Sequence, residues 1–185
     1  MSGVIKQPIV INNLTIRYMY SIIFDFDNTL TKCDVSSQID NLIGNEIVFT
    51  EMVLHNDFKQ LLQILKNKNI KLFVLSFGYN NIIINYLKNH DLYKYFDGIY
   101  TPSSFGLKDG YSYAKAANGK NKLIKIICKG ILNENILLVD DNRTNIAWAK
   151  EEGFKVLMID SRFGITNDDF VNLCGLTKYW IKKIE

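Results

Sequence analysis

The fold of this chain can be worked out from residues 20–31, which read YSIIFDFDNTLT. The first five residues form a short apolar run rich in β-branched and aromatic side chains, which is typical of a buried strand. The run ends abruptly at Asp25, and Asp27, Asn28 and Thr29 then add acidic and turn-forming residues. The stretch predicts a buried strand whose carboxyl end is polar, with Asn28 favouring the turn.

Beyond residue 56 the chain alternates amphipathic segments with apolar ones. In the first amphipathic segment, Phe58, Leu61 and Leu65 recur at helical spacing. We expect helices over about residues 56–67, 81–89, 122–129 and 144–151. We expect strands over about residues 70–75, 98–100, 136–139 and 155–159. Residues 1–19 are predicted to add a hairpin or edge strand, and residues 167–185 a closing helix.

This alternation predicts the fold class. Strands that are apolar throughout need helices on both sides, so the pattern indicates a doubly wound α/β domain with a parallel sheet. A chain of 185 residues is long enough for one such domain, and we expect residues 1–185 to form it, with a core over about 20–160. In these sheets ligands bind at the carboxyl ends of the strands, near the topological switch point.

Composition excludes several classes of protein. Hydrophobic residues make up 48% and charged residues 22% of the chain, which is typical of a soluble globular protein. The net charge of +3 is too weak to indicate a nucleic-acid partner. Cys33, Cys128 and Cys174 show no metal-ligand spacing and indicate free thiols in a reducing compartment. With no secretory signal pattern, we expect a cytoplasmic monomer without membrane insertion, although export by another route stays open.

Polar residues follow the predicted strands at several points. Ser76-Phe77-Gly78 follows the second strand, Lys120 or Lys122 opens a helix, and Asp140-Asp141 follows the fourth strand. Taken alone, each pattern has an ordinary explanation as a turn, a helix cap or a solvated lysine. Their joint occurrence with Asp25 and Asp27 at one edge of a parallel sheet favours a chemical site.

Together these residues resemble the four motifs of the haloacid dehalogenase (HAD) superfamily, over about residues 20–160. The motif residues are Asp25 to Thr31 in the first motif, Ser76 in the second, Lys120 in the third, and Asp140-Asp141 with Asn145 in the fourth. Lys120 fits the third motif better than Lys122 because of its spacing to Leu123 and Ile124. Asn145 departs from the pattern, since many relatives carry a second Asp there, and the site loses one negative charge. The resemblance implies a Rossmann-like fold.

The resemblance also implies a magnesium-dependent phosphatase. Asp25 would attack the phosphoryl group and form an aspartyl-phosphate, and Asp27 would act as general acid and base. Relatives that cleave carbon–halogen bonds lack an acid at the position of Asp27, because a halide needs no proton. Lys120 would supply positive charge against the anionic substrate.

The same resemblance assigns the remaining roles. Mg²⁺ would be held by Asp25, the backbone carbonyl of Asp27 and Asp141, with Asp140 and Asn145 as further candidates. The phosphate would be bound by Ser76 and the backbone amides of Phe77 and Gly78. Thr29 would orient the first motif through its hydroxyl.

The length of the segment after the first motif limits the kinds of substrate that we expect. Residues 31–55 are too few for a helical cap domain, since each helix with its connection needs about fifteen residues, so only a flap is expected there. An open site resembles the capless enzymes that act on macromolecules, notably phosphotyrosine phosphatases, and implies a phosphorylated protein as partner. Five aromatic residues could line the mouth, although ordinary packing is the simpler interpretation: Phe77, Tyr79, Phe105, Tyr111 and Tyr113.

Other functions stay open. A small phosphorylated metabolite or a nucleic-acid 3′-phosphate could be the substrate of the same site. A HAD fold used only for binding is a further alternative. A phospho-acceptor receiver module uses similar residues, but there the acid pair lies on the first strand and the acceptor Asp comes later, which is the opposite order.

Overall fold

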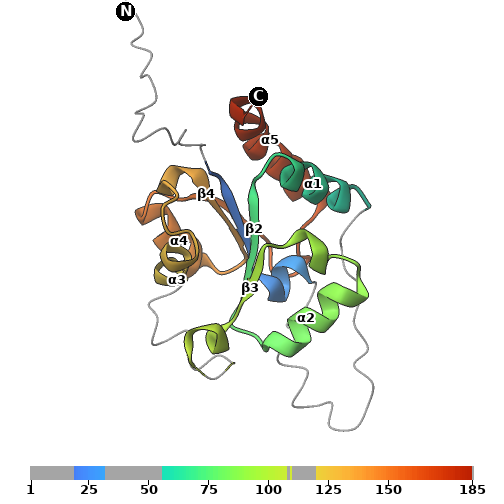
Figure 1. The fold of residues 1–185 in the computed structure, drawn as a ribbon, viewed down its shortest axis with the longest axis vertical. Coiled ribbons are helices and arrows are strands. Elements are labelled where there is room, and N and C mark those ends of the chain that lie inside the picture. Colours follow the sequence, from blue (N-terminus) through green and yellow to red (C-terminus); the bar gives the residue numbers. More distant parts are fainter. Residues whose placement is uncertain (1–18, 32–55, 108, 110–119, 185) are drawn as a thin grey trace, which may run out of the picture.

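The computed structural model describes residues 19–31, 56–107, 109 and 120–184. Five strands form one parallel sheet in the order β3-β2-β1-β4-β5 (Figure 1). The strands are β1 (Ser21–Phe24), β2 (Lys71–Leu75), β3 (Gly98–Tyr100), β4 (Ile136–Asp140) and β5 (Lys155–Met158). The bounds of each strand lie within one residue of those predicted, so the apolar runs of the sequence located every strand of the sheet.

Five α-helices connect or follow these strands in the described residues. They are α1 (Asn56–Asn67), α2 (Asn80–Asn89), α3 (Asn121–Ile127), α4 (Arg143–Glu151) and α5 (Asn167–Ile184). Helix α3 ends two residues earlier than predicted, and Gly130 follows with a φ of +88°. The predicted closing helix is confirmed as α5, where Thr166 and Asp169 exchange hydrogen bonds at the first turn.

The helices cover both faces of the sheet because successive side chains of β1 point to opposite sides. Ile22 and Phe24 belong to a core cluster that includes residues of α1, α2 and α5, whereas Ile23 belongs to a second cluster with residues of α3 and α4. Figure 1 shows α3 and α4 on one side of the sheet and α1, α2 and α5 on the other. The predicted doubly wound fold is therefore confirmed.

Aromatic stacking fixes α5 beside the start of β1. The rings of Tyr20 and Trp180 stack with their centroids 4.9 Å apart, and both side chains are buried. Such a pair contributes about 0.5–1.5 kcal/mol beyond the burial of its area. The closing helix therefore belongs to the core that supports the central strand.

The topological switch point lies between β1 and β4. From β1 the chain builds outward through β2 and β3, and it then returns to β4 on the other side of β1. The backbone N–H of Asp25 donates to the carbonyl of Val139 at 2.9 Å, so β1 and β4 stay paired up to their carboxyl ends. Residues that follow these two strands must meet there.

Two predictions fall wholly or mainly outside the described residues. The predicted hairpin or edge strand lies in residues 1–19, of which Met19 is described, and the flap lies in residues 31–55, of which Thr31 is described. In the described part of the chain, no helix combines the length and the apolar character needed to cross a membrane.

A loop after β5 packs tightly against the turn that follows β1. The N–H of Ile165 donates to the carbonyl of Thr29 at 3.0 Å, and Gly164 has a φ of +64°. A Cβ atom on Gly164 would lie 2.9 Å from the carbonyl oxygen of Thr31. Only glycine fits this contact, because both its backbone conformation and the space exclude a side chain.

Gly164→Ala should therefore destabilise the protein by more than the cost of the left-handed conformation alone, which is about 1–2 kcal/mol. Gly130→Ala is the matched control, since Gly130 also has a positive φ but its Cβ would have no heavy atom of the described residues within 4 Å, apart from those of its chain neighbours. Urea unfolding of the two variants checks this. Equal losses of unfolding free energy would contradict the proposed steric contact.

Candidate active site

A tight turn directly after β1 presents Asp25 and Asp27. The Asp25 carboxylate accepts a hydrogen bond from the N–H of Phe26 at 2.7 Å, and the N–H of Thr31 closes the turn on the carbonyl of Phe26 at 3.1 Å. Asn28 has a φ of +56°, a conformation that asparagine tolerates better than most residues. The predicted structural role of Asn28 is therefore confirmed.

Lys120 lies between two carboxylates at the centre of the site. Its Nζ is 2.7 Å from Oδ1 of Asp25 and 2.8 Å from Oδ2 of Asp140, and the side chain is only 1% exposed. Burial alone lowers the pKa of Lys120, but Asp140 and Asp25 more than offset it, so the pKa is raised and the ammonium stays charged. Lys122 is exposed, so Lys120 is the lysine that the fold brings to the acids.

Asp140 is fully buried and held from three sides. Besides Lys120, the backbone N–H of Asn142 donates to its Oδ1 at 2.8 Å, and Nδ2 of Asn145 donates to both oxygens at 3.2 Å. Asn145 therefore turns its amide nitrogen toward the cluster and positions Asp140. A second aspartate at this position would place two carboxylates against each other, so the amide removes a repulsion.

Three carboxylates converge at the ends of β1 and β4. Ligand oxygens of Asp25, Asp140 and Asp141 all lie within 4.8 Å of one another. Burial raises the pKa of Asp25 well above its usual value, and the neighbouring Asp140 and Asp141 add to the rise despite the opposing effect of Lys120. Burial and Asp140 likewise raise the pKa of Asp141. The three carboxylates repel one another when ionised, and a bound cation would offset this repulsion.

The donor set fits Mg²⁺. When ionised, the three carboxylates carry three negative charges against the single positive charge of Lys120, and a divalent cation would balance the remainder. Hard carboxylate oxygens are the ligands that Mg²⁺ prefers. Asp141 is the half-buried member and Asp140 the fully buried one, so Asp25 and Asp141 are the better candidates for direct ligands. The Asp27 carboxylate is outside this group of three, which agrees with a role for its side chain other than as a ligand.

The loop after β2 reaches the same site. Ser76 is buried, and its Oγ accepts a hydrogen bond from the N–H of Gly78 at 3.0 Å. The Gly78 amide, predicted to bind phosphate, is thus engaged within the loop, while the Ser76 hydroxyl keeps its own hydrogen to donate. The ring centroid of Phe77 lies 5.6 Å from Nζ of Lys120, which places this loop beside the lysine.

Thr29 differs from the prediction. Its hydroxyl is buried and makes no hydrogen bond to the described residues, whereas its carbonyl accepts from Ile165. The turn is therefore braced through the backbone of Thr29, because the hydroxyl faces the interior.

The aromatic residues of the predicted mouth have mixed positions. Phe77 and Phe105 pack, partly buried, against one core cluster, and Tyr79 packs against the other. Of these three, Phe77 contacts a predicted site residue, namely Lys120. Tyr111 and Tyr113 lie outside the described residues.

Two positioning residues were not found from the sequence. Asn142 accepts hydrogen bonds from the N–H groups of Thr144 and Asn145 at the start of α4, while its own N–H holds Asp140. Asp109 accepts from the N–H groups of Asn80 and Ser103 and so joins the loops after β2 and β3. Asparagine directly before a predicted helix is a readable cap signal, whereas nothing near Asp109 in sequence indicates its distant partners.

Magnesium should stabilise the folded protein through this cluster. At a Mg²⁺ concentration of about 100 times Kd, binding adds about 2.7 kcal/mol, which raises Tm by roughly 5–10 °C for a chain of this size. Asp141→Asn should remove most of this shift. Glu151→Gln, an exposed acid at the end of α4, should keep it. A shift that persists in Asp141→Asn, measured by differential scanning fluorimetry, would contradict the assigned site.

Comparison with known proteins agrees with this geometry. The family of haloacid dehalogenase-like hydrolases matches residues 39–159, which is more than half of the chain and includes Ser76, Lys120 and Asp141. The match begins after the first motif, so Asp25 is tied to the family site by its contacts in the structure. No match was found among curated proteins.

Solved structures show the same fold at low sequence identity. A predicted HAD-like family hydrolase from Porphyromonas gingivalis is 15% identical, with a TM-score of 0.53 and coverage of 85% of this chain and 98% of that one. A hydrolase from Streptococcus pneumoniae TIGR4 is 15% identical, with a TM-score of 0.55 and coverage of 88% and 100%. L-2-haloacid dehalogenase from Xanthobacter autotrophicus is 14% identical, with a TM-score of 0.50 and coverage of 87% and 88%. The chain therefore belongs to the haloacid dehalogenase-like hydrolase family.

Proposed function

We propose that this hydrolase is a magnesium-dependent phosphatase that cleaves a phosphate monoester through an aspartyl-phosphate on Asp25. The observation that carries the proposal is the position of Asp25. Its carboxylate lies 2.7 Å from the buried ammonium of Lys120 and shares a three-carboxylate cluster with Asp141. A nucleophile, a fixed cation and a candidate metal site therefore meet at one point.

This arrangement addresses the main barrier to the reaction. A carboxylate and a phosphate monoester are both anions and repel each other until positive charge is placed between them. Lys120 provides one such charge and also favours the ionised, nucleophilic form of Asp25. Bound Mg²⁺ would supply the rest of the positive charge and polarise a phosphoryl oxygen.

Asp27 favours phosphoryl transfer over dehalogenation. It lies two residues beyond Asp25 on the same turn and is 8% exposed. In the proposed reaction it protonates the leaving oxygen and then deprotonates the water that hydrolyses the aspartyl-phosphate. A departing halide needs no proton, so dehalogenation would leave Asp27 without a role.

We further propose that the substrate is a phosphorylated protein, with phosphotyrosine as the reacting residue. Two features support this. The segments between the first turn and α1 and between residue 109 and Lys120 are short for a cap domain, which favours an open site. Phe77, beside Lys120, also offers a ring that could contact an aromatic leaving group.

A substrate panel tests the proposal. With Mg²⁺ present, we expect hydrolysis of para-nitrophenyl phosphate, and kcat/KM for a phosphotyrosine peptide about tenfold above that for sugar phosphates, since an aromatic contact contributes up to about 1.5 kcal/mol. Sugar phosphates or a nucleic-acid 3′-phosphate reacting faster would overturn the protein-substrate assignment. Release of chloride from 2-chloropropionate without phosphatase activity would overturn the reaction itself.

A further inference from the structure

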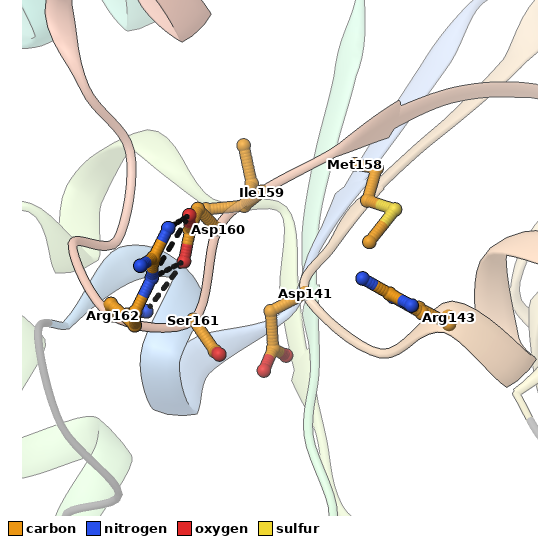
Figure 2. Close-up of a pocket in the computed structure, with 7 residues that line it drawn as sticks. All are labelled: Asp141, Arg143, Met158, Ile159, Asp160, Ser161 and Arg162. Carbon is orange, nitrogen blue, oxygen red and sulfur yellow. Dashed lines mark hydrogen bonds and ion pairs between the residues drawn. The ribbon is translucent and has the colours of Figure 1, made fainter.

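A second binding region adjoins the proposed catalytic cluster. A pocket of about 510 Å³ lies between the turn after β4 and the loop after β5, and Asp141 is part of its wall. Figure 2 shows Arg143 on one side of Asp141 and the Asp160–Arg162 pair on the other, with the hydroxyl of Ser161 turned toward Asp141. Because Asp141 also belongs to the acid cluster, a molecule in this pocket would touch the reaction centre.

The two arginines of the pocket differ in their charge balance. Arg162 is neutralised by Asp160, with Nε at 3.0 Å from Oδ1 and Nη2 at 2.6 Å from Oδ2, and these hydrogen bonds lower the pKa of Asp160 to about 2. Among the residues that the structure describes, no carboxylate pairs with Arg143. Of the two arginines, Arg143 is therefore the one that makes no ion pair with the described residues.

The position of Arg143 is unfavourable for helix stability. It is the first residue of α4, where the helix dipole favours negative charge, and the first turn of α4 contains no acidic residue. Its guanidinium extends over the pocket beside Met158 (Figure 2). A planar guanidinium binds a carboxylate or phosphate through two parallel hydrogen bonds, and Met158 adds a flexible apolar surface beside it.

We propose that this pocket holds the leaving-group side of the substrate and that Arg143 binds a second anionic group there. This inference rests on the proposed phosphatase function and narrows its substrate class to phosphate monoesters that carry another anion close to the reacting phosphate. In a phosphotyrosine protein that anion is an acidic side chain next to the phosphotyrosine. In a small molecule it is a carboxylate or a further phosphate on the same carbon skeleton.

Arg143→Gln tests the proposal on substrates that differ only in the second anion. For a phosphotyrosine peptide with flanking Glu residues, kcat/KM should fall about tenfold, mainly through KM, because a charge-assisted contact is lost. For the same peptide with flanking Gln residues, and for para-nitrophenyl phosphate, kcat/KM should change less than twofold. Arg143→Lys should restore part of the preference. Lys150→Gln, the same charge change on an exposed residue of α4, should have no effect.

The role of Arg143 and the phosphatase activity can fail independently in these measurements. Hydrolysis of para-nitrophenyl phosphate with equal effects of Arg143→Gln on both peptides would overturn the role of Arg143 and leave the phosphatase intact. Arg143→Gln could instead slow the hydrolysis of a small phosphate that carries a carboxylate and leave that of the acidic peptide unchanged. In that case the second anion would belong to a metabolite. The same peptides carrying a non-hydrolysable phosphonate give a binding readout independent of turnover. Their Kd should weaken about tenfold in Arg143→Gln for the acidic peptide alone.

Discussion

Asp25→Asn should reduce the turnover of para-nitrophenyl phosphate by a factor on the order of 10³ or more, because the amide cannot form the phosphorylated intermediate. The geometry around position 25 should survive, since Lys120 keeps its contact with Asp140 at 2.8 Å. Initial rates at saturating Mg²⁺ check this prediction. Asp91→Asn, the same substitution at an exposed residue paired with Lys94, should keep full activity.

The same variant should be at least as stable as the natural protein when metal is removed. Burial, with Asp140 and Asp141, raises the folded-state pKa of Asp25 above its unfolded value of 3.8. A raised carboxyl pKa stabilises the fold at low pH, and this contribution is lost as pH rises through the folded pKa. The Tm advantage of Asp25→Asn in EDTA should therefore grow as the pH rises from the unfolded-state pKa of 3.8 through the raised folded-state pKa. An inactive variant that unfolds at lower temperature throughout would indicate a structural role instead.

The fold was predictable because its signals are local. Residues 20–24, apolar except for Ser21, and residues 136–139 are each followed by acidic residues, so their strands and the polar edge of the sheet could be placed together. The end of α3 was less readable, because the apolar pattern continues through Cys128 after the helix has stopped. Helix ends depend on a few backbone contacts, which periodicity does not encode.

The site was predictable as a set of residue types, but not as a set of contacts. Motif spacing brought Asp25, Lys120 and Asp141 together correctly, and burial decided between Lys120 and Lys122. The direction of each hydrogen bond could not be read. Asn145 donates to Asp140, and the Gly78 amide turns to Ser76, because side-chain orientation depends on neighbours distant in sequence.

The loop after β5 was missed for a different reason. Residues 160–165 carry no pattern of the four motifs, yet they brace Thr29 and line the pocket beside Asp141. The sheet order shows why they belong there, since β5 lies next to β4 and ends at the same edge. Every strand end on that edge is a candidate position, whether or not a motif marks it.

Lys120→Met should destabilise the protein by about 3–5 kcal/mol, lowering Tm by roughly 6–20 °C. The Lys120 side chain is 1% exposed and its ammonium lies within 2.8 Å of both Asp25 and Asp140, so its removal leaves two buried carboxylates without their counter-charge. The cost comes from these uncompensated charges, because methionine fills a similar volume. Lys122→Met, two residues on in the first turn of α3, is the matched control, and since Lys122 is exposed its effect should stay within about 0.5 kcal/mol.

The pH dependence of the Lys120→Met defect distinguishes charge from packing. Without Lys120 the pKa of Asp25 should rise further, because the ammonium is the group that lowers it. Protonation then relieves the repulsion, so the stability difference from the natural protein should shrink as pH falls from about 7 toward about 4. A loss caused by a packing defect would not change with pH. Urea unfolding of both lysine variants across this range, in EDTA, decides whether the buried ammonium holds the acid cluster together.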